Sequence, residues 1–381
     1  MKRILLLSEI FPPQHGGSGR WFWEIYTRLS EQKVFFVVGD FPGAVNFDRS
    51  HNFDVKRMNL SSQAWGLRSI VAIRFYLSCW WRLSRLVRKN RIQEIHCARS
   101  LPEGVIALLI KVSQGVQYRC YVHGEDVETA STSKELSFLT KLVMYKAKQI
   151  ICNSQNSAEI VLKNWKIPTN RISVMHPGVD VAKFQNDLKF ERPPNWNERT
   201  VLLTVGRLQK RKGHDMAIRA LPTIRKSIPN IHYCIVGDGA EYECLKRLSL
   251  DLDVADNVEF LTDIDDGEMV ARYQNCDLFI LPNRTVDHDI EGFGIVLLEA
   301  QACGAPVLAG NSGGTKETME VGKTGVIVDC TDPKALAQTL IKLLEDMDEL
   351  KSMGQKGRDH VKHNFDWTIL AKRAQRLFDK N

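Results

Sequence analysis

Apolar runs and amphipathic segments alternate along the chain in two successive series. In the first series, short apolar or β-branched runs predict strands at Ile4–Ile10, Val34–Gly39, Ile92–Cys97, Tyr118–Val122, Ile150–Asn153 and Ile172–His176. Apolar residues at helical spacing predict helices between these strands, near residues 18–30, 66–90, 103–114, 134–147 and 155–165.

The same alternation begins again after residue 200. Its strands are predicted at Val201–Val205, His232–Val236, Val258–Leu261, Leu278–Leu281, Pro306–Ala309 and Gly325–Val328. Its helices are predicted near residues 213–226, 240–251, 266–275, 294–303 and 332–346. Strands that alternate with helices form parallel sheets covered on both faces. The sequence therefore predicts an α/β fold with two doubly wound, Rossmann-like parallel-sheet domains that face a cleft.

The length of 381 residues exceeds what one hydrophobic core usually supports, in agreement with two domains. Residues 1–185 and 200–365 carry the two series, and the Pro-containing segment 186–199 between them is the expected linker. No apolar run is long enough to span a bilayer. Nine scattered cysteines without a Cys-x-x-Cys pair fit a reducing cytoplasm.

The net charge of +7 is unevenly divided along the chain. Residues 1–195 hold 28 Lys and Arg against 16 Asp and Glu, whereas the remainder holds 24 against 29. The interval 55–93 contains no acidic residue but several basic and aromatic ones. A helix of this kind can lie on an anionic membrane, so Arg82, Arg85 and Arg88 are candidate acceptor- or membrane-binding residues. The alternative is a core helix, because a helical spacing also relates Ile70, Ile73, Leu77, Trp80, Leu83 and Val87.

The most informative stretch is Glu291–Glu299, which reads Glu-Gly-Phe-Gly-Ile-Val-Leu-Leu-Glu. If all of it were one helix, the two carboxylates would lie about 80° apart around its axis. The glycines favour a tight turn at 292–294 followed by a helix from Ile295 to Cys303. Unpaired N–H groups at the start of that helix suit an anion, while the two acids can bind neighbouring hydroxyls. For either acid alone, a solvated or Lys-paired glutamate is the simpler interpretation.

Other candidates follow predicted strands, at the edge where open parallel sheets bind ligands. Arg207 and Lys212 can together neutralise a diphosphate, because Arg forks onto phosphate oxygens and Lys adds a compact charge. Gly16 and Gly17 open a helix and can present backbone N–H groups to a phosphate. His123 ends a strand and is followed by a glycine, which allows close approach of a ligand. Each of these residues alone is more often solvated or structural.

Together, these motifs resemble the donor-binding signature of the family 4 retaining glycosyltransferases. Besides Glu-x7-Glu around Gly-Phe-Gly, the matches in the family's order are Phe11-Pro-Pro13 with Gly16-Gly17, His123-Gly-Glu125, His176-Pro-Gly-Val-Asp180, Val205-Gly-Arg207 through Arg211-Lys-Gly213, Gly237-Asp-Gly239 and Ser312-Gly-Gly314. The resemblance spans nearly the whole chain. It implies the two-domain architecture called GT-B, in which the last helix, residues 366–381 here, returns to the first domain.

The resemblance implies glycosyl transfer from a nucleotide diphosphate sugar and assigns roles to individual residues. Arg207 and Lys212 would bind the donor diphosphate, and His123 would lie beside the sugar and its anomeric centre. Glu291 would bind sugar hydroxyls, and Glu299 would bind the ribose. Further donor contacts would come from Gly16, Gly17, Gly237, Phe293, Gly294, Ile295 and Val296.

Whether Glu125 or Asp126 carries the family's accessory acid is left open by the sequence. The resemblance implies retention of the anomeric configuration, with no cofactor or metal ion, because Arg207 and Lys212 can stabilise the departing diphosphate. Similarity to bacterial mannosyltransferases mildly favours GDP-mannose over UDP-sugars as the donor. The acceptor is expected to be a hydroxyl of a glycan, lipid-linked or phosphorylated compound. We expect no nucleic-acid partner, and a location in the cytoplasm or at the inner face of the cell membrane.

Two other function classes stay open. One is a sugar-phosphate epimerase or phosphorylase of the same architecture. It would need more carboxylates around the sugar ring, or a Lys carrying a pyridoxal cofactor, and neither has a recognisable motif. The other class is a noncatalytic polyol-phosphate-binding subunit. It is weakened by the joint presence of His123, Arg207, Lys212, Glu291 and Glu299.

Overall fold

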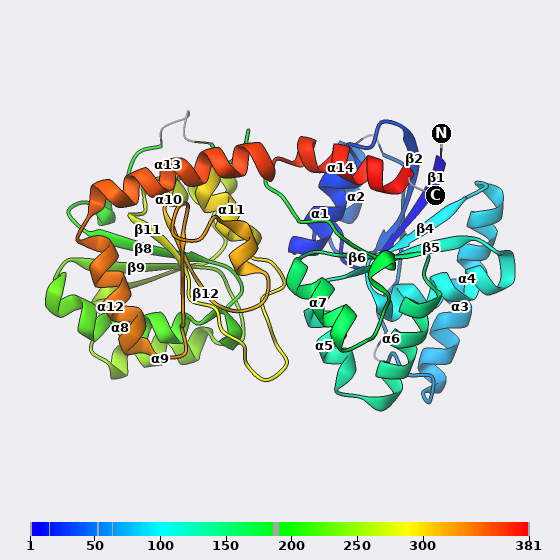
Figure 1. Cartoon of the computed structure of the whole chain (residues 1–381), viewed down its shortest axis with the longest axis horizontal. Helices are drawn as coiled ribbons and strands as arrows, with labels where there is room; N and C mark the ends of the chain where they lie inside the picture. The colour runs from blue at the N-terminus through cyan, green and yellow to red at the C-terminus, as the bar shows by residue number, and fades with distance from the viewer. Residues whose placement is uncertain (1, 15, 52, 63, 186–189, 380–381) are drawn as a thin grey trace. The chain divides into compact units, whose positions relative to one another are not determined.

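The chain divides into two compact units, which are Met1–Pro177 with Trp367–Asn381 (unit 1) and Gly178–Asp366 (unit 2) (Figure 1). Each unit contains one parallel sheet with helices on both faces, so the predicted fold class is confirmed. Residues 186–189 of the expected linker lie outside the described residues. The computed structural model of the protein describes residues 2–14, 16–51, 53–62, 64–185 and 190–379.

Unit 1 is built on a seven-stranded parallel sheet with the order β3-β2-β1-β4-β5-β6-β7. In β1, Ile4 and Leu6 face one core cluster, whereas Leu5 and Leu7 face the other. Because both faces are covered, the strand reads as a continuous apolar run. The strands are β1 (Lys2–Ser8), β2 (Gln32–Gly39), β3 (Val55–Met58), β4 (Glu94–Cys97), β5 (Gln117–Val122), β6 (Gln149–Cys152) and β7 (Ile172–Val174).

The helices of unit 1 cover the two faces of this sheet. They are α1 (Gly17–Tyr26), α2 (Ala44–Ser50), α3 (Ile70–Lys89), α4 (Val105–Gln114), α5 (Glu125–Ser131), α6 (Lys134–Lys146), α7 (Gln155–Lys163) and α14 (Trp367–Asp379). One face carries α1 and α14, and Figure 1 shows the red α14 beside the blue α1. The other face carries α3, α4 and α6. The sequence did not predict β3, α2 or α5, which are four to seven residues long.

A buried ion cluster fixes the end of α14 on unit 1. Lys2 Nζ lies 2.6 Å from Glu94 Oε2 and donates to the carbonyl oxygen of Phe378 at 2.9 Å. Arg119, which is 1% exposed, pairs with Glu94 and donates to the carbonyl oxygens of Leu377 and Phe378 at 3.1 and 3.3 Å. These carbonyls belong to the last turn of α14, where intrahelical partners are missing. The two cations therefore cap this helix and balance its dipole.

Unit 2 is built on a six-stranded parallel sheet with the order β10-β9-β8-β11-β12-β13. Its strands are β8 (Thr200–Val205), β9 (Ile231–Val236), β10 (Val258–Leu261), β11 (Leu278–Leu281), β12 (Val307–Gly310) and β13 (Val326–Val328). Its helices are α8 (His214–Ser227), α9 (Tyr242–Asp251), α10 (Asp266–Asn275), α11 (Ile295–Ala302), α12 (Pro333–Leu344) and α13 (Met347–Asn364). Two apolar clusters, one on each face of the sheet, form its core.

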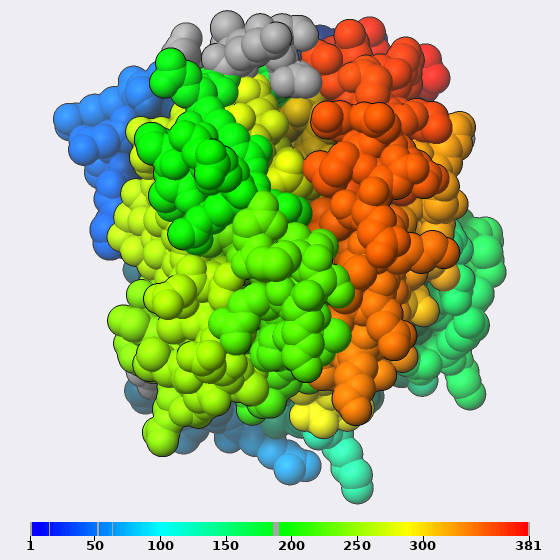
Figure 2. Space-filling model, turned by 90° about the vertical axis from the view of Figure 1, so that its left-hand side faces the viewer, coloured from blue at the N-terminus to red at the C-terminus, as the bar shows by residue number. Residues whose placement is uncertain are grey.

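Helices α12 and α13 complete the surface of unit 2, as the orange side chains in Figure 2 show. α12 packs on α8, and α13 packs on α11. The sequence did not predict α13, although it is 18 residues long. Its inner face includes Gly354 and Gly357, and a Cβ at Gly354 would lie 2.2 Å from the Gly304 carbonyl oxygen. Close packing by these two glycines thus accompanies the apolar Leu350, Met353 and Val361 on the buried face of the helix.

Candidate functional site

The loops that follow β8 and β9 in unit 2 lie against each other. Leu208 N–H donates to the Asp238 carbonyl oxygen at 2.9 Å. A side chain at Gly237 would place its Cβ 2.1 Å from the Gly206 carbonyl oxygen, and its φ of +145° also favours glycine. Lys212 passes close to Gly206, because a Cβ there would lie 3.8 Å from Lys212 Nζ. Gly237 and Lys212, two of the predicted donor-binding residues, thus belong to one loop cluster.

The Glu291 carboxylate is buried between two cations. It is 7% exposed, and its Oε2 atom lies 2.5 Å from Arg211 Nη1 and 2.6 Å from Lys212 Nζ. Burial raises the pKa of Glu291, but the charges of Lys212 and Arg211 outweigh burial and the net pKa is lowered. The carboxylate is therefore ionised at neutral pH. Both contacts use Oε2, so Oε1 can accept a hydrogen bond from a ligand hydroxyl.

The backbone of Glu291 is held by the loop after β12. Gly314 N–H donates to the Glu291 carbonyl oxygen at 3.0 Å. A Cβ at Gly313 would lie 1.7 Å from the same oxygen, and φ is +62° at this position. The fully buried Asn283 amide donates to the Ser312 carbonyl oxygen at 3.2 Å. Glycine at position 313 is therefore required for the loop to approach Glu291.

The predicted turn and helix after Glu291 are confirmed. Helix α11 begins at Ile295 and ends at Ala302, one residue before the predicted end, and Gly294 precedes it with a φ of 92°. Glu291 itself lies in the loop rather than in the helix. The N–H groups of Ile295 and Val296 therefore have no carbonyl partner within the helix.

Glu299 and Phe293 have structural contacts that the sequence did not reveal. Glu299 is 8% exposed, and its Oε2 accepts a hydrogen bond from the Tyr273 hydroxyl at 2.9 Å. Tyr273 comes from α10 and orients this carboxylate. The Phe293 side chain is 3% exposed and belongs to the apolar core, so the turn can offer only the backbone of this residue to a ligand.

Arg207 and Arg211 occupy the same loop but differ in their contacts. The exposed Arg207 side chain forms no hydrogen bond or ion pair with any residue that the structure describes. Arg211 is 4% exposed and bridges Glu291 and Asp289, with Nε 3.0 Å from Asp289 Oδ1. Arg211 was not among the predicted site residues, although it directly precedes Lys212. Its burial is the property that the sequence did not show.

The carboxylates of this region do not gather into a metal site. Within the described ranges, no group of three or more His, Cys, Asp and Glu side chains is placed to hold a metal ion. The metal-independent reaction expected from the sequence stays a prediction.

His123, after β5 in unit 1, is held on several sides. Its Nε2 donates to the Ala98 carbonyl oxygen at 2.9 Å, and its backbone N–H donates to Asp126 Oδ1 at 3.0 Å. The rings of Trp21 and Phe22 from α1 meet the imidazole edge to face, with centroids 5.7 and 5.9 Å away. The ring is thus fixed, with Nδ1 left for a ligand. Asp126 supports the His123 backbone, and the question of the accessory acid stays open.

The glycine-rich start of α1 lies beside the loop after β1. α1 begins at Gly17, and a Cβ at Gly16 would lie 3.2 Å from Ile10 Cγ2. The N–H groups of the first turn of α1 therefore follow the carboxyl end of β1, as the sequence predicted.

A charged cluster at the same end of this sheet was not predicted. Arg99, after β4, contacts both Glu9, after β1, and the fully buried Glu103. The Glu9 N–H donates to Glu103 Oε1 at 2.8 Å. Burial raises the pKa of Glu103, although the Arg99 charge opposes it. The acids lie too far from other motifs in the sequence to have been recognised as one group.

Helix α3 exposes an apolar and basic face. Its buried face consists of Ala72, Tyr76, Cys79, Leu83, Ser84 and Val87. The helix therefore packs on the core, as the alternative predicted. The predicted stripe is wrong in its first half, because Ile70, Ile73 and Leu77 are exposed. Two stripes of residues along α3 share the helical spacing. The buried stripe can approach the sheet closely because it contains the small side chains of Ala72 and Cys79. The exposed side chains are Ile70, Val71, Ile73, Arg74, Leu77, Ser78, Trp81, Arg82, Arg85, Arg88 and Lys89. No described helix is long and apolar enough to cross a membrane.

The structure thus groups the predicted residues within each unit. Unit 2 brings together Gly237, Lys212 and Glu291 through its loops, with Arg207 on the same loop as Lys212. Unit 1 holds Gly16, Gly17 and His123 at the carboxyl end of its own sheet. Arg82, Arg85 and Arg88 lie apart from these residues, on α3.

Two family models match the chain. Residues 15–183 match the family described as Glycosyltransferase Family 4, and residues 186–360 match the family described as Glycosyl transferases group 1. The chain is 29% identical to a GDP-mannose-dependent alpha-(1-6)-phosphatidylinositol monomannoside mannosyltransferase of Mycobacterium tuberculosis, over 97% of this chain and 96% of the relative. It is 28% identical to a GDP-mannose-dependent monoacylated alpha-(1-6)-phosphatidylinositol monomannoside mannosyltransferase of Corynebacterium glutamicum, over 99% and 97%.

Solved structures share the fold at lower identity. HepE from Anabaena in complex with UDP superposes with a TM-score of 0.81 at 17% identity, and the match covers 100% of both chains. Sucrose-phosphate synthase from Thermosynechococcus elongatus superposes with a TM-score of 0.79 at 22% identity, over 99% of this chain and 98% of that chain.

The buried His214, at the start of α8 in unit 2, predicts that the stability of the fold depends on pH. It is 1% exposed, and neither ring nitrogen has a hydrogen-bond partner among the described residues. Burial, with the charges of Lys212 and Arg284, lowers the pKa of His214 to about 3. Because this is below the unfolded value, His214 stabilises the fold above about pH 6.5, and that contribution is lost as the pH falls.

We therefore expect His214→Leu to change the pH dependence of unfolding. Between pH 7 and pH 5 the wild-type protein should lose about 2 kcal/mol more of its free energy of unfolding than the variant. Urea unfolding at both pH values measures this difference. Equal losses in the two proteins would show that His214 does not remain neutral in the fold.

Proposed function

Because the chain belongs to the family 4 glycosyltransferases, we propose that it is a retaining hexosyltransferase that moves mannose from GDP-mannose to a hydroxyl of a lipid-linked acceptor. The observation that carries this proposal is the similarity over nearly the whole chain to two GDP-mannose-dependent mannosyltransferases. Both relatives are named for a phosphatidylinositol monomannoside acceptor. The residues of unit 2 supply the charges that a nucleotide diphosphate sugar requires.

In this mechanism the bond between the anomeric carbon and the diphosphate oxygen breaks, and negative charge develops on the diphosphate. Lys212 and Arg207 stabilise this charge, since preorganised cations act most strongly where charge develops. The acceptor oxygen forms its bond to the anomeric carbon on the face that the diphosphate leaves. Its proton passes to the departing diphosphate. The configuration is thereby retained, and no divalent ion is needed for charge balance.

Glu291 positions the sugar in this proposal. The Oε1 atom of Glu291 accepts hydrogen bonds from sugar hydroxyls, while Arg211 and Lys212 keep its carboxylate ionised and fixed. In unit 1, His123 can offer Nδ1 to a ligand, because its Nε2 is held by the Ala98 carbonyl oxygen. Glu299, oriented by Tyr273, binds the ribose.

The test is an assay with GDP-mannose and a panel of UDP-sugars, with and without a phosphatidylinositol mannoside acceptor. We expect slow release of GDP in water, fast release with the acceptor, and a new α-linked mannoside in the product spectrum by NMR. Addition of EDTA should leave the rate unchanged. Faster turnover with a UDP-sugar would show that the donor is that UDP-sugar rather than GDP-mannose. No transfer from any donor would refute the proposed transferase activity.

Glu291→Gln should reduce turnover in this assay by about a hundredfold or more, because a preorganised polar group at the reacting sugar is lost. Asp289→Asn is the matched variant, since it also removes a carboxylate partner from Arg211. We expect it to lose far less activity. Equal losses would mean that Glu291 acts only by holding Arg211.

Removing Arg207 or Lys212 tests their role toward the diphosphate. Each change to Ala should weaken GDP binding by about 1.5–3 kcal/mol and guanosine binding much less, because a charged hydrogen bond to phosphate is lost. Calorimetric titration with both ligands measures the difference. Arg219→Ala, which removes an exposed charge from α8, should change neither affinity. Similar losses for GDP and guanosine would contradict a diphosphate contact.

The exposed face of α3 supports a second part of the proposal, that unit 1 associates with an anionic membrane that carries the acceptor. Ile70 is 68% exposed and Trp81 is 51% exposed, so apolar side chains are available to the lipid interface. Arg82, Arg85 and Arg88 can meet lipid phosphates beside them. Each basic residue near an anionic bilayer contributes about 1 kcal/mol.

Changing Arg82, Arg85 and Arg88 together to Gln should therefore reduce binding to anionic liposomes at low salt. The control changes Lys134, Lys141 and Lys146, which are exposed on α6 of the same unit, and removes the same charge. Liposome sedimentation should show a large loss only for the α3 variant. If the wild-type protein ignores anionic liposomes, the acceptor is a soluble compound.

A further inference from the structure

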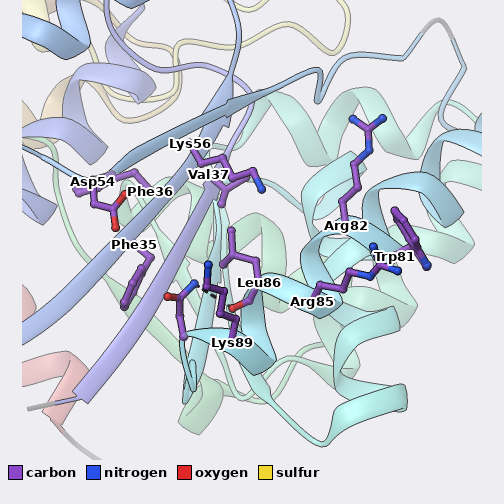
Figure 3. A pocket seen from close by; sticks show the side chains of 11 residues that line it. Phe35, Phe36, Val37, Asp54, Lys56, Trp81, Arg82, Arg85, Leu86 and Lys89 are labelled. Atoms are coloured by element: carbon purple, nitrogen blue, oxygen red, sulfur yellow. Dashed lines mark hydrogen bonds between the residues drawn. The ribbon is translucent and has the colours of Figure 1, made fainter.

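A cavity of about 460 Å³ opens in unit 1 between the edge of the sheet and α3. Its walls come from the middle of β2, the start of β3 and the last turns of α3, as the close-up in Figure 3 shows. Cavities of this size hold small ligands. The basic residues in its lining are Lys56, Arg82, Arg85 and Lys89.

These four cations have no counter-ions. None of their side chains forms an ion pair with a residue that the structure describes. The one carboxylate in the lining is Asp54, which leaves three positive charges in excess. The neighbouring Arg57, by contrast, pairs with Asp48 and donates to two backbone carbonyls. Pairing is thus available in this part of the sheet, and the cavity residues lack it.

Ordinary surface roles explain this arrangement poorly. Lys89 lies in the last turn of α3, where a cation balances the helix dipole. Arg82 and Arg85 come one to two turns earlier, and Lys56 belongs to β3, so the dipole does not account for them. The Arg85 guanidinium stacks on Trp81, 3.6 Å from the ring centroid, which holds it in one orientation. Like charges that line one hollow repel one another, and an anion bound there would relieve this repulsion.

The cavity lies away from the motifs of unit 1. Helix α3 links the parallel strands β3 and β4, so it runs back along the sheet and its last turns lie near the amino ends of the strands. Consistently, the Asn90 carbonyl oxygen accepts a hydrogen bond from Arg3, at the start of β1. His123 follows the carboxyl end of β5. An anion in the cavity is therefore separate from a donor bound near His123.

We propose that this cavity is a second anion site, which binds the phosphoryl group of a small phosphate ester. Arg82 and Arg85 can fork onto phosphate oxygens, while Lys89 of the same helix and Lys56 of β3 can add compact charges. A lipid headgroup and a free phosphate ester share this chemistry. The proposal concerns binding alone and does not depend on glycosyl transfer.

The test compares two double variants that remove the same charge. Lys56→Gln with Lys89→Gln changes the cavity, whereas Arg68→Gln with Arg74→Gln changes exposed residues at the other end of α3, outside the lining. Glycerol 3-phosphate and inorganic phosphate are titrated by calorimetry against each protein. Sedimentation with phosphatidylcholine vesicles, with and without phosphatidylglycerol, forms the second arm. Circular dichroism confirms that both variants fold.

In at least one arm, we expect the cavity variant to bind about tenfold or more weakly than the control variant. A selective loss with the soluble esters assigns the site to a free phosphate ester, and a selective loss with vesicles alone assigns it to a lipid headgroup. Equal losses in the two variants would mean that charge acts diffusely along α3. That result, or no binding by the wild-type protein in either arm, would overturn the proposal.

Discussion

Burial of the Glu291 carboxylate between Arg211 and Lys212 is the constraint on which the site of unit 2 depends. A buried ion is tolerated only when paired charges and hydrogen bonds replace the water that it loses. The loop after β8 supplies both cations, and the loop after β11 supplies the acid. The loop after β11 is also tied to the first turn of α8, because Arg284 and Asp215 form two side-chain contacts at 2.8 and 2.9 Å.

Such pairing requires the loop backbones to touch, and the glycines of the motifs make this contact possible. A Cβ at Gly213 would lie 1.7 Å from the Pro282 carbonyl oxygen, so the β8 loop can pack on the β11 loop only with glycine there. Gly313 does the same between the β12 loop and Glu291. The glycines and the charged residues of the motifs therefore act together in building the site. The glycines bring the backbones together, and the charges are then fixed in the space that remains.

The sequence predicted the elements with long periodic patterns and the motifs at their ends. The turn before α11 could be predicted because glycine restricts the conformations that the chain can use there. Arg211 could not, because a basic residue next to Lys212 reads as solvated until its burial is known. The exposed face of α3 was also ambiguous, since two apolar stripes share the helical spacing and only packing on the sheet separates them. α13 was missed because Gly354 and Gly357 interrupt the apolar residues of its buried face.

The cations on α3 and the cation Lys212 differ in whether a carboxylate pairs with them. On α3 they are uncompensated, so they act at a distance and attract anions, an effect that salt weakens. Lys212 is compensated in the free protein by Glu291, and this pairing keeps it extended and oriented. In the proposed function, the donor diphosphate would compete with Glu291 for Lys212. Glu291 would then keep Arg211 as its partner, so Lys212 can turn to the diphosphate without leaving a buried carboxylate unpaired. Because two cations pair with the Glu291 carboxylate, one of them can change partners while the other keeps the carboxylate paired.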